Sequence, residues 1–104
     1  MTTSGALGAL AQWYAAHCDG EWEHSYGITL ETLDNPGWSL SIDLVGTELE
    51  HVPFPPIDHQ LQHPTSWRRC WRDGAAFHAA CGLNELNAVL DTFTAWANAD
   101  RSGA

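Results

Sequence analysis

Apolar and polar side chains alternate between Trp22 and Leu44, and this pattern constrains the fold more than any other feature of the chain. The apolar members are Tyr26, Ile28, Leu30, Trp38, Leu40, Ile42 and Leu44. Period-two alternation is typical of strands with one buried and one solvated face. Because the two alternating runs are close in sequence, the segment predicts an antiparallel β-hairpin.

The break between the two runs has the composition of a tight turn. It reads Asp34-Asn35-Pro36-Gly37. Proline presets φ at the first central position of a turn, and glycine tolerates the positive φ of the second. The sequence therefore predicts a type II turn over residues 35–38, with Pro36 and Gly37 at its centre.

A second hairpin is predicted further along the chain. Two short extended runs, at about 67–72 and 75–80, flank Asp73-Gly74, and an Asp-Gly pair favours a two-residue hairpin turn. Between the hairpins, prolines at positions 53, 55, 56 and 64 remove backbone donors. Residues 46–66 are accordingly expected to form a long extended loop, in which Glu48 to His51 extend or flank the sheet.

Helical periodicity marks both ends of the chain. The first stripe comprises Leu7, Leu10, Ala11, Tyr14 and Cys18, and the second comprises Leu83, Leu86, Val89, Leu90, Phe93, Trp96 and Ala97. The first predicts a helix over about 6–17, ended by Asp19-Gly20. The second predicts a C-terminal helix that starts near Gly82 or Asn84. Residues 1–4 and 101–104 are small and polar and are expected to fray.

These elements predict an α+β fold in the order α-β-β-β-β-α. Two hairpins would form a four-stranded, mostly antiparallel sheet, with the N-terminal and C-terminal helices packed on one face. A length of 104 residues fits a single domain, 1–104, with an ordered core at about 6–98.

The charge balance narrows the class of partner. Thirteen acidic residues face four basic ones, all arginine, which gives a formal net charge of −9. Such a chain would be repelled by nucleic acid and by anionic membranes, so neither is expected as a partner. Electrostatic attraction favours a basic protein partner. The alternative is that the acidic residues only keep a small protein soluble.

The cysteines and the N-terminus bear on location. Cys18, Cys70 and Cys81 are odd in number and form no CxxC motif, which is typical of a reducing compartment. The first residues lack the basic and apolar regions of a signal peptide, and no window reaches the roughly 18 apolar residues of a membrane span. A cytoplasmic protein is therefore expected.

Enzymatic and metal-binding alternatives have weak support. His59 and His63 stand four apart, with Asp58 and His51 nearby, but the surrounding prolines argue against the helix that would bring them together. Cys18 is expected to pack as a small hydrophobe at the end of the first helix. Several carboxylates could serve acid–base hydrolysis, yet no spacing pairs any two of them. The sequence thus predicts no catalytic residue, no cofactor and no metal.

A set of short motifs resembles a known family. These motifs are Trp13-Tyr14, Cys18-Asp19-Gly20, Trp22-Glu23-His24, Tyr26-Gly27, the run from Thr32 to Trp38, Ile42-Asp43-Leu44 and the run from Gly46 to Glu50. In this order they resemble the immunity protein 53 family of bacterial polymorphic toxin systems. The resemblance implies a cytosolic protein that binds and neutralises a cognate toxin.

The predicted function is therefore toxin neutralisation by occlusion of the active site with an acidic surface. The expected contact residues are Glu21, Trp22, Glu23, Glu31, Asp34, Asp43, Glu48 and Glu50, although a solvated side chain is the alternative for each carboxylate. The core is the favoured place for Trp22, Trp38, Trp67 and Trp96. The partner would be a basic toxin domain, such as a nuclease, and the free protein a monomer. A small metal-dependent or carboxylate-based hydrolase and a structural adaptor with no toxin partner remain alternatives.

Overall fold

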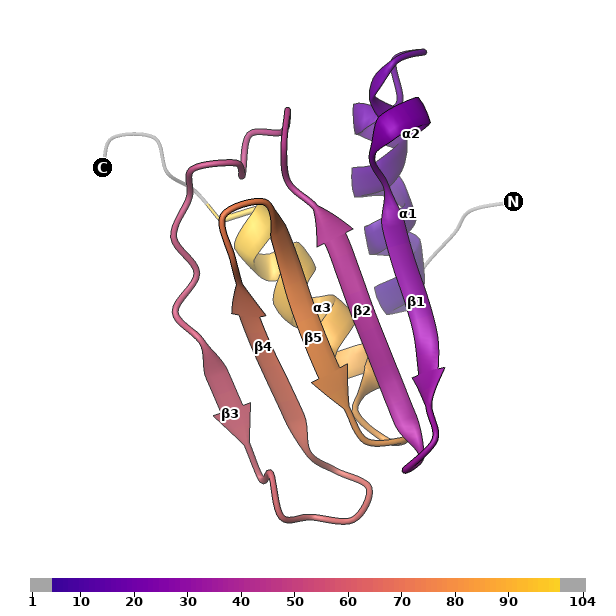
Figure 1. Ribbon diagram of the computed structural model, residues 1–104, viewed down its shortest axis with the longest axis vertical. Helices are drawn as coiled ribbons and strands as arrows, with labels where there is room; N and C mark the ends of the chain where they lie inside the picture. Colours follow the sequence, from indigo (N-terminus) through magenta and orange to yellow (C-terminus); the bar gives the residue numbers. More distant parts are fainter. Residues whose placement is uncertain (1–4, 100–104) are drawn as a thin grey trace.

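The computed structural model describes residues 5–99, which form one sheet covered by helices on one face (Figure 1). The elements are α1 (Gly5–His17), α2 (Trp22–Ser25), β1 (Ile28–Leu33), β2 (Gly37–Asp43), β3 (Ile57–His59), β4 (Arg68–Arg72), β5 (Ala76–Cys81) and α3 (Leu86–Ala97). Within this range the strands form a five-stranded sheet, in the order β1-β2-β5-β4-β3, with every neighbouring pair antiparallel. The predicted α+β class and terminal helices are confirmed. The fraying expected at 1–4 and 101–104 lies outside the described residues.

The sheet has five strands, so the prediction of four was wrong. The additional strand, β3, lies within the region expected to be a loop, and it pairs with β4 through Ile57↔Cys70 and His59↔Arg68. The prolines flank this strand but do not interrupt it. Residues 57–59 therefore keep the backbone donors that an edge strand needs.

The first hairpin is confirmed, but its turn differs from the prediction. Leu33 pairs with Gly37, so the loop comprises only residues 34–36 and Gly37 belongs to β2. Gly37 is not among the residues with positive φ, which rules out the type II turn. A Cβ at this position would instead collide with the carbonyl oxygen of Cys81 on β5. The glycine is required by the close approach of two strands.

Residues immediately before β1 form a helical turn instead of the start of the hairpin. Residues 22–25 are the short helix α2, and the strand starts only at Ile28. Side chains supply the hydrogen bonds for this turn, because Asp19 accepts from the amides of Glu21 and Trp22, each at 3.0 Å. Local capping of this kind overrides the alternating pattern at its first positions.

The second hairpin and the last helix are confirmed with shifted boundaries. The Asp73 amide donates to the carbonyl of Ala76 at 3.0 Å, so Gly74 and Ala75 occupy the centre of the turn in place of Asp73 and Gly74. The last helix begins at Leu86, because residues 82–85 form a separate turn in which the Glu85 amide donates to Gly82. Leu83 consequently lies outside the helix and is 48% exposed.

The core lies between the sheet and the two long helices. Its fully buried large side chains include Ile42, Leu44, Leu49, Phe77, Val89, Leu90 and Phe93. Aromatic rings join the layers edge to face, with Phe93 of α3 lying 5.0 Å from Trp13 and 5.1 Å from Phe77 between ring centroids. Offset and edge-to-face pairs add to the gain from burial, so this cluster fixes α1 and α3 on the sheet.

The face that helix α1 presents to the core is only partly the predicted one, since Leu10 of the predicted stripe is buried as expected. Trp13 is buried, whereas Leu7 of the predicted stripe is 61% exposed and Cys18 is exposed just beyond the helix. The expectation that Cys18 packs as a small hydrophobe was therefore wrong. A tryptophan buries more area than a leucine, so the rotation that buries Trp13 is preferred.

The other tryptophans differ in burial. Trp22 is buried, as expected, while Trp38, Trp67 and Trp96 are half-buried at the margins of the core. Trp71 is exposed on the open sheet face, where it stacks on His78 at a centroid distance of 5.4 Å.

Among residues 5–99, none of the helices is long and apolar enough to span a bilayer.

Candidate functional site

The predicted contact residues separate into two groups in space. Glu21, Trp22, Glu23, Asp43, Glu48 and Glu50 lie near the end of the sheet where α1 finishes, β1 starts and β2 ends, whereas Glu31 lies within β1 and Asp34 in the turn that follows it. Asp34 lies in the turn at the far end of β1 (Figure 1). A single compact epitope made of all eight residues is therefore absent from the described part of the chain.

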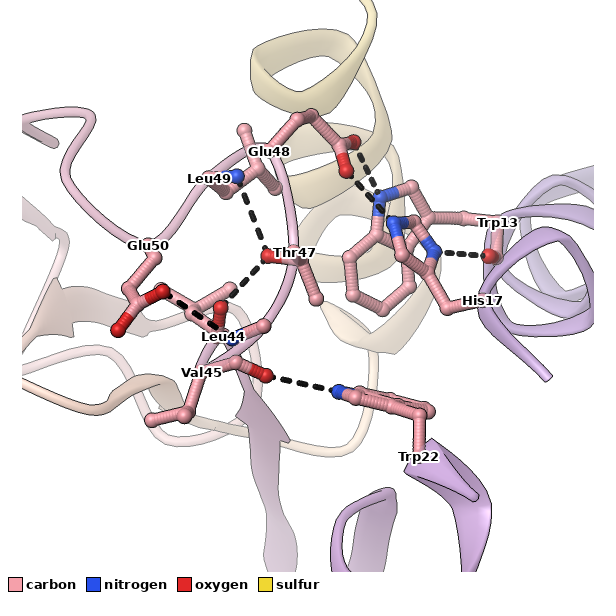
Figure 2. Close-up of polar contacts among 10 residues, drawn as sticks. Trp13, His17, Trp22, Leu44, Val45, Thr47, Glu48, Leu49 and Glu50 are labelled. Atoms are coloured by element: carbon pink, nitrogen blue, oxygen red, sulfur yellow. Dashed lines mark hydrogen bonds and ion pairs between the residues drawn. The ribbon is translucent and has the colours of Figure 1, made fainter. Parts of the chain in front are cut away.

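Glu48 connects the loop after β2 to helix α1 (Figure 2). One carboxylate oxygen accepts from the Trp13 indole at 3.1 Å, and the other lies 2.6 Å from Nε2 of His17. The His17 Nδ1 donates to the Trp13 carbonyl at 2.8 Å. Partial burial on its own would raise the pKa of Glu48, but the hydrogen bonds from His17 and Trp13 outweigh it and lower that pKa. Glu48 therefore stabilises the contact between the loop after β2 and helix α1.

Trp22 and the turn after β2 form the other half of this arrangement. The Trp22 indole donates to the carbonyl of Val45 at 2.8 Å, and the side chain is only 8% exposed. In the same turn, the amide of Gly46 donates to Glu50 at 3.2 Å. Gly46 has a φ of 81° and leaves room for the indole, since a Cβ there would lie 3.3 Å from Trp22. The side chains of Trp22 and Glu50 therefore stabilise the turn after β2. Only a small part of the Trp22 side chain is accessible to a partner.

Glu23 is also used within the fold. Its two oxygens accept from the amides of Asp19 at 2.9 Å and Gly20 at 2.8 Å. Backbone hydrogen bonds lower the pKa of Glu23, and those from Trp22 and Glu21 likewise lower the pKa of Asp19. The two carboxylates hold residues 19–23 in a fixed conformation, so the Asp19-Gly20 and Trp22-Glu23 motifs of the sequence serve one local structure.

Glu31 and Asp43 lie on the sheet face away from the helices, as their positions in the alternating pattern predict. Their cross-strand neighbours, Ser39 and Ala76, are small. One oxygen of Asp43 accepts from the amide of Gly27 at 2.9 Å, which secures the start of β1. Glu31 is exposed and carries no such bond, so it alone of the two is available to a partner.

Arg72 is a structural residue that sequence reasoning missed. Its guanidinium donates to the carbonyls of Leu49 at 2.8 Å, Glu50 at 2.8 Å and Val52 at 2.7 Å, and its Nε donates to Asp73 at 2.9 Å. The planar fork of arginine suits several acceptors at once. Because the three loop carbonyls are about 20 residues away in sequence, local patterns gave no signal of this contact.

The remaining charges are unevenly paired. The three described arginines are all engaged: Arg68 with Glu85 at 2.6 Å, Arg69 with Asp58 at 3.2 Å, and Arg72 with backbone carbonyls. Between residues 5 and 99, the carboxylates that lack a hydrogen bond or ion pair are those of Glu21, Glu31, Asp34 and Asp91. Three of these four precede, occupy or follow β1. Within the described range, the carboxylates that have no internal hydrogen bond or ion pair therefore lie mainly in the segment that runs from the start of α2 through β1 to the hairpin turn.

An apolar groove of about 540 Å³ lies between α1 and β1. Its lining consists of Leu7, Leu10, Ala11, Tyr14, Tyr26, Gly27, Ile28 and Leu30. A second hollow of about 490 Å³, lined in part by Glu21 and Trp22, shares Tyr26 with the groove. Much of the apolar stripe predicted for the first helix thus faces a groove that is open to solvent. The sequence did signal these residues, but it assigned them to the core.

Several of the cysteines and histidines are buried or bonded within the fold. Burial raises the pKa of Cys70 and of Cys81 to about 11, so both are neutral thiols at neutral pH. His63 accepts from the amides of Thr65 and Ser66, at 3.1 Å and 2.8 Å, and His59 lies in β3. Across residues 5–99, no three His, Cys, Asp or Glu side chains are grouped to hold a metal ion.

Comparison with known proteins gives one match. The family model described as immunity protein 53 matches residues 7–98. Neither the search of curated proteins nor the search of solved structures returned a match. The matched range includes all five strands, the whole of α3 and all but the first two residues of α1. Since the match covers most of the chain, this protein belongs to the immunity protein 53 family.

Proposed function

We propose that this protein binds and neutralises a cognate bacterial toxin, in the cytoplasm, by covering the toxin's active site. The family match over residues 7–98 carries this proposal, because it implies an immunity role and a toxin partner. The protein would act by binding alone, without a reaction, a metal or a cofactor of its own. It would be a monomer until it meets the toxin.

The charge distribution supports a basic toxin. The formal net charge is −9, and the described arginines are all held by internal partners. A surface of one sign accelerates encounter with a partner of the opposite sign, and this effect weakens as salt increases. Nucleases, which bind a polyanion, are a class of toxin with the required positive surface.

Hydrogen bonds within the fold support a smaller contact set than the predicted one. Glu23, Asp43, Glu48 and Glu50 accept hydrogen bonds that hold loops and strands, so their replacement would disturb the fold as well as any interface. The side chains of Glu21, Glu31 and Asp34 are exposed and accept no hydrogen bond within the described part of the fold. These three, which we call the β1 carboxylates, are the members of the predicted set that we propose meet the toxin directly.

Charge reversal tests the electrostatic part of this proposal. The triple variant Glu21→Lys, Glu31→Lys, Asp34→Lys should associate with the toxin encoded beside this chain about tenfold more slowly at low salt, with a smaller difference at high salt. The matched pair is Glu31→Lys and Asp91→Lys, because both remove an unpaired carboxylate but Asp91 lies on α3. Stopped-flow measurements at several salt concentrations give the rates. Equal rates for Glu31→Lys and Asp91→Lys would contradict a role for the β1 carboxylates.

A further inference from the structure

The two edges of the sheet are protected to different degrees. β3 has only three residues, and Pro53, Pro55, Pro56 and Pro64 lie around it. β1 has six residues, Ile28–Leu33, with no proline or lysine among them. Natural proteins usually block exposed edges with short strands, proline or lysine, because an open edge pairs with other chains. By these criteria the β3 edge is blocked and the β1 edge is open.

The backbone of β1 offers hydrogen-bonding groups on its outer side. The amide of Asp43 donates to the carbonyl of Gly27 at 3.0 Å, which fixes the phase of the ladder between β1 and β2. In an antiparallel ladder alternate residues bond to the same neighbour. Thr29 and Glu31 therefore direct their backbone groups toward β2, while those of Leu30 and Thr32 point to the open edge.

Apolar side chains lie beside this open edge. The groove between α1 and β1 is lined by Leu7, Tyr26 and Leu30, which are 61%, 37% and 40% exposed. Leu30 has its side chain on the groove side of the strand, whereas Glu31 points to the opposite face. A strand added next to β1 would consequently place one set of alternate side chains in the groove and the other set near Glu31.

The negative charge near the β1 edge indicates the chemistry of the partner. Unpaired carboxylates precede the strand at Glu21, occupy it at Glu31 and follow it at Asp34. An incoming strand that alternates apolar residues with arginine or lysine would satisfy both the groove and these carboxylates. A second copy of this protein would not, because each copy carries a net charge of −9 and the same acidic edge.

We propose that an extended segment of the toxin, with alternating apolar and basic side chains, adds to β1 as a sixth strand. This inference rests on the proposed function and specifies how the toxin is held. Main-chain hydrogen bonds from Leu30 and Thr32 fix the segment, and the groove formed by Leu7, Tyr26 and Leu30 binds its apolar side chains. The β1 carboxylates bind its basic side chains.

Two exposed leucines provide a matched test. Leu30 lies in the groove and is 40% exposed, and Leu61 lies in the loop between β3 and β4 and is 42% exposed. Leu30→Lys and Leu61→Lys change the net charge equally, so a difference between them reflects the position of the substitution and not the overall charge. Calorimetric titration with the inactivated toxin domain should show Leu30→Lys binding at least about tenfold more weakly, and Leu61→Lys within about threefold of the unaltered protein. Equal losses for both variants would overturn the proposal.

Hydrogen exchange gives an independent readout of the added strand. The amides of Leu30 and Thr32 should exchange at least about tenfold more slowly in the complex, while those of Thr29 and Glu31 are already protected by β2. Unchanged exchange at Leu30 and Thr32 in a tight complex would refute strand addition and leave the proposed function intact. Absence of binding by the unaltered protein would refute the proposed function itself, and this proposal with it. A homodimer that buries β1 would also overturn the proposal.

Discussion

At the scale of single residues, most of the charged side chains of this protein hold its structure. Arg72 donates hydrogen bonds to three carbonyls of the loop after β2, and Glu48 connects the same loop to α1. From sequence, an acidic side chain near a strand could be either a contact or a structural residue. The distinction depends on partners that are distant along the chain, as the 35-residue separation of Trp13 and Glu48 illustrates. Local patterns carry no information about such pairs.

Replacement of Arg72 by lysine should reduce the free energy of unfolding by about 1–3 kcal/mol, because an ammonium group cannot serve the carbonyls of Leu49, Glu50 and Val52 together. Arg69→Lys is the matched control. The Arg69 side chain is 59% exposed in its ion pair with Asp58, so a change of roughly 0.5 kcal/mol or less is expected. Urea denaturation followed by tryptophan fluorescence measures both values. Similar losses for the two variants would contradict the assigned role of Arg72.

Asp73 gives the stability a dependence on acid pH. Hydrogen bonds from the amide of Ala75, the side chain of His78 and the amide of Ala76 lower the pKa of Asp73 from 3.8 to about 2. The unfolded chain therefore binds this proton at a higher pH than the folded chain does. The stabilisation is present above pH 3.8 and is lost as the pH falls toward about 2.

Asp73→Asn should flatten this dependence, because an amide oxygen can still accept from the backbone amides but does not titrate in this range. Thermal denaturation of both proteins between about pH 5 and pH 2 makes the comparison. The variant should have a shallower slope, although Asp19, Glu23 and Glu48 also have lowered pKa values and keep the slope above zero. Identical slopes would show that Asp73 does not contribute.

At the scale of elements, the sequence predicted whatever has a local pattern. The first hairpin and both long helices were found because each repeats apolar residues at a regular spacing, and the second hairpin was found from its Asp-Gly pair. Strand β3 was missed, since three residues between prolines form no period, and its pairing with β4 depends on contacts within the folded sheet. The apolar groove was missed for a related reason. A stripe on a helix shows which face is apolar, but it does not show how much of that face the rest of the protein covers.

Gly37→Ala tests the explanation given for the first hairpin. A methyl group at Gly37 would collide with the carbonyl of Cys81, so the free energy of unfolding should fall by about 1–3 kcal/mol. Gly74→Ala is the control, because nothing lies within 4 Å of a Cβ there and its φ is not positive. Its effect should remain within about 0.5 kcal/mol. If both substitutions are neutral under chemical denaturation, close strand approach is not the reason for Gly37.

At the scale of the whole molecule, the fold presents a rigid, acidic edge from a small core. Aromatic packing of Trp13 on Phe93 and the hydrogen bond from Trp13 to Glu48 hold α1, and pairing with β2 holds β1, so both sides of the groove are in place before binding. Preorganisation of this kind suits an inhibitor that must act as soon as it meets its target. Sequence alone indicated the acidity and the family, but the location of the unpaired charge required the folded structure.

Titration of toxin activity tests the central claim most directly. The cognate toxin domain is held at a concentration well above the dissociation constant, and increasing amounts of the immunity protein are added. If inhibition is by occlusion, the residual toxin activity should fall linearly to a sharp equivalence point. Toxin recovered from the complex by denaturation and refolding should have its original mass and activity. Complete inactivation by much less than an equivalent amount, or a lasting covalent change in the toxin, would contradict the account, because either result requires catalysis by this protein.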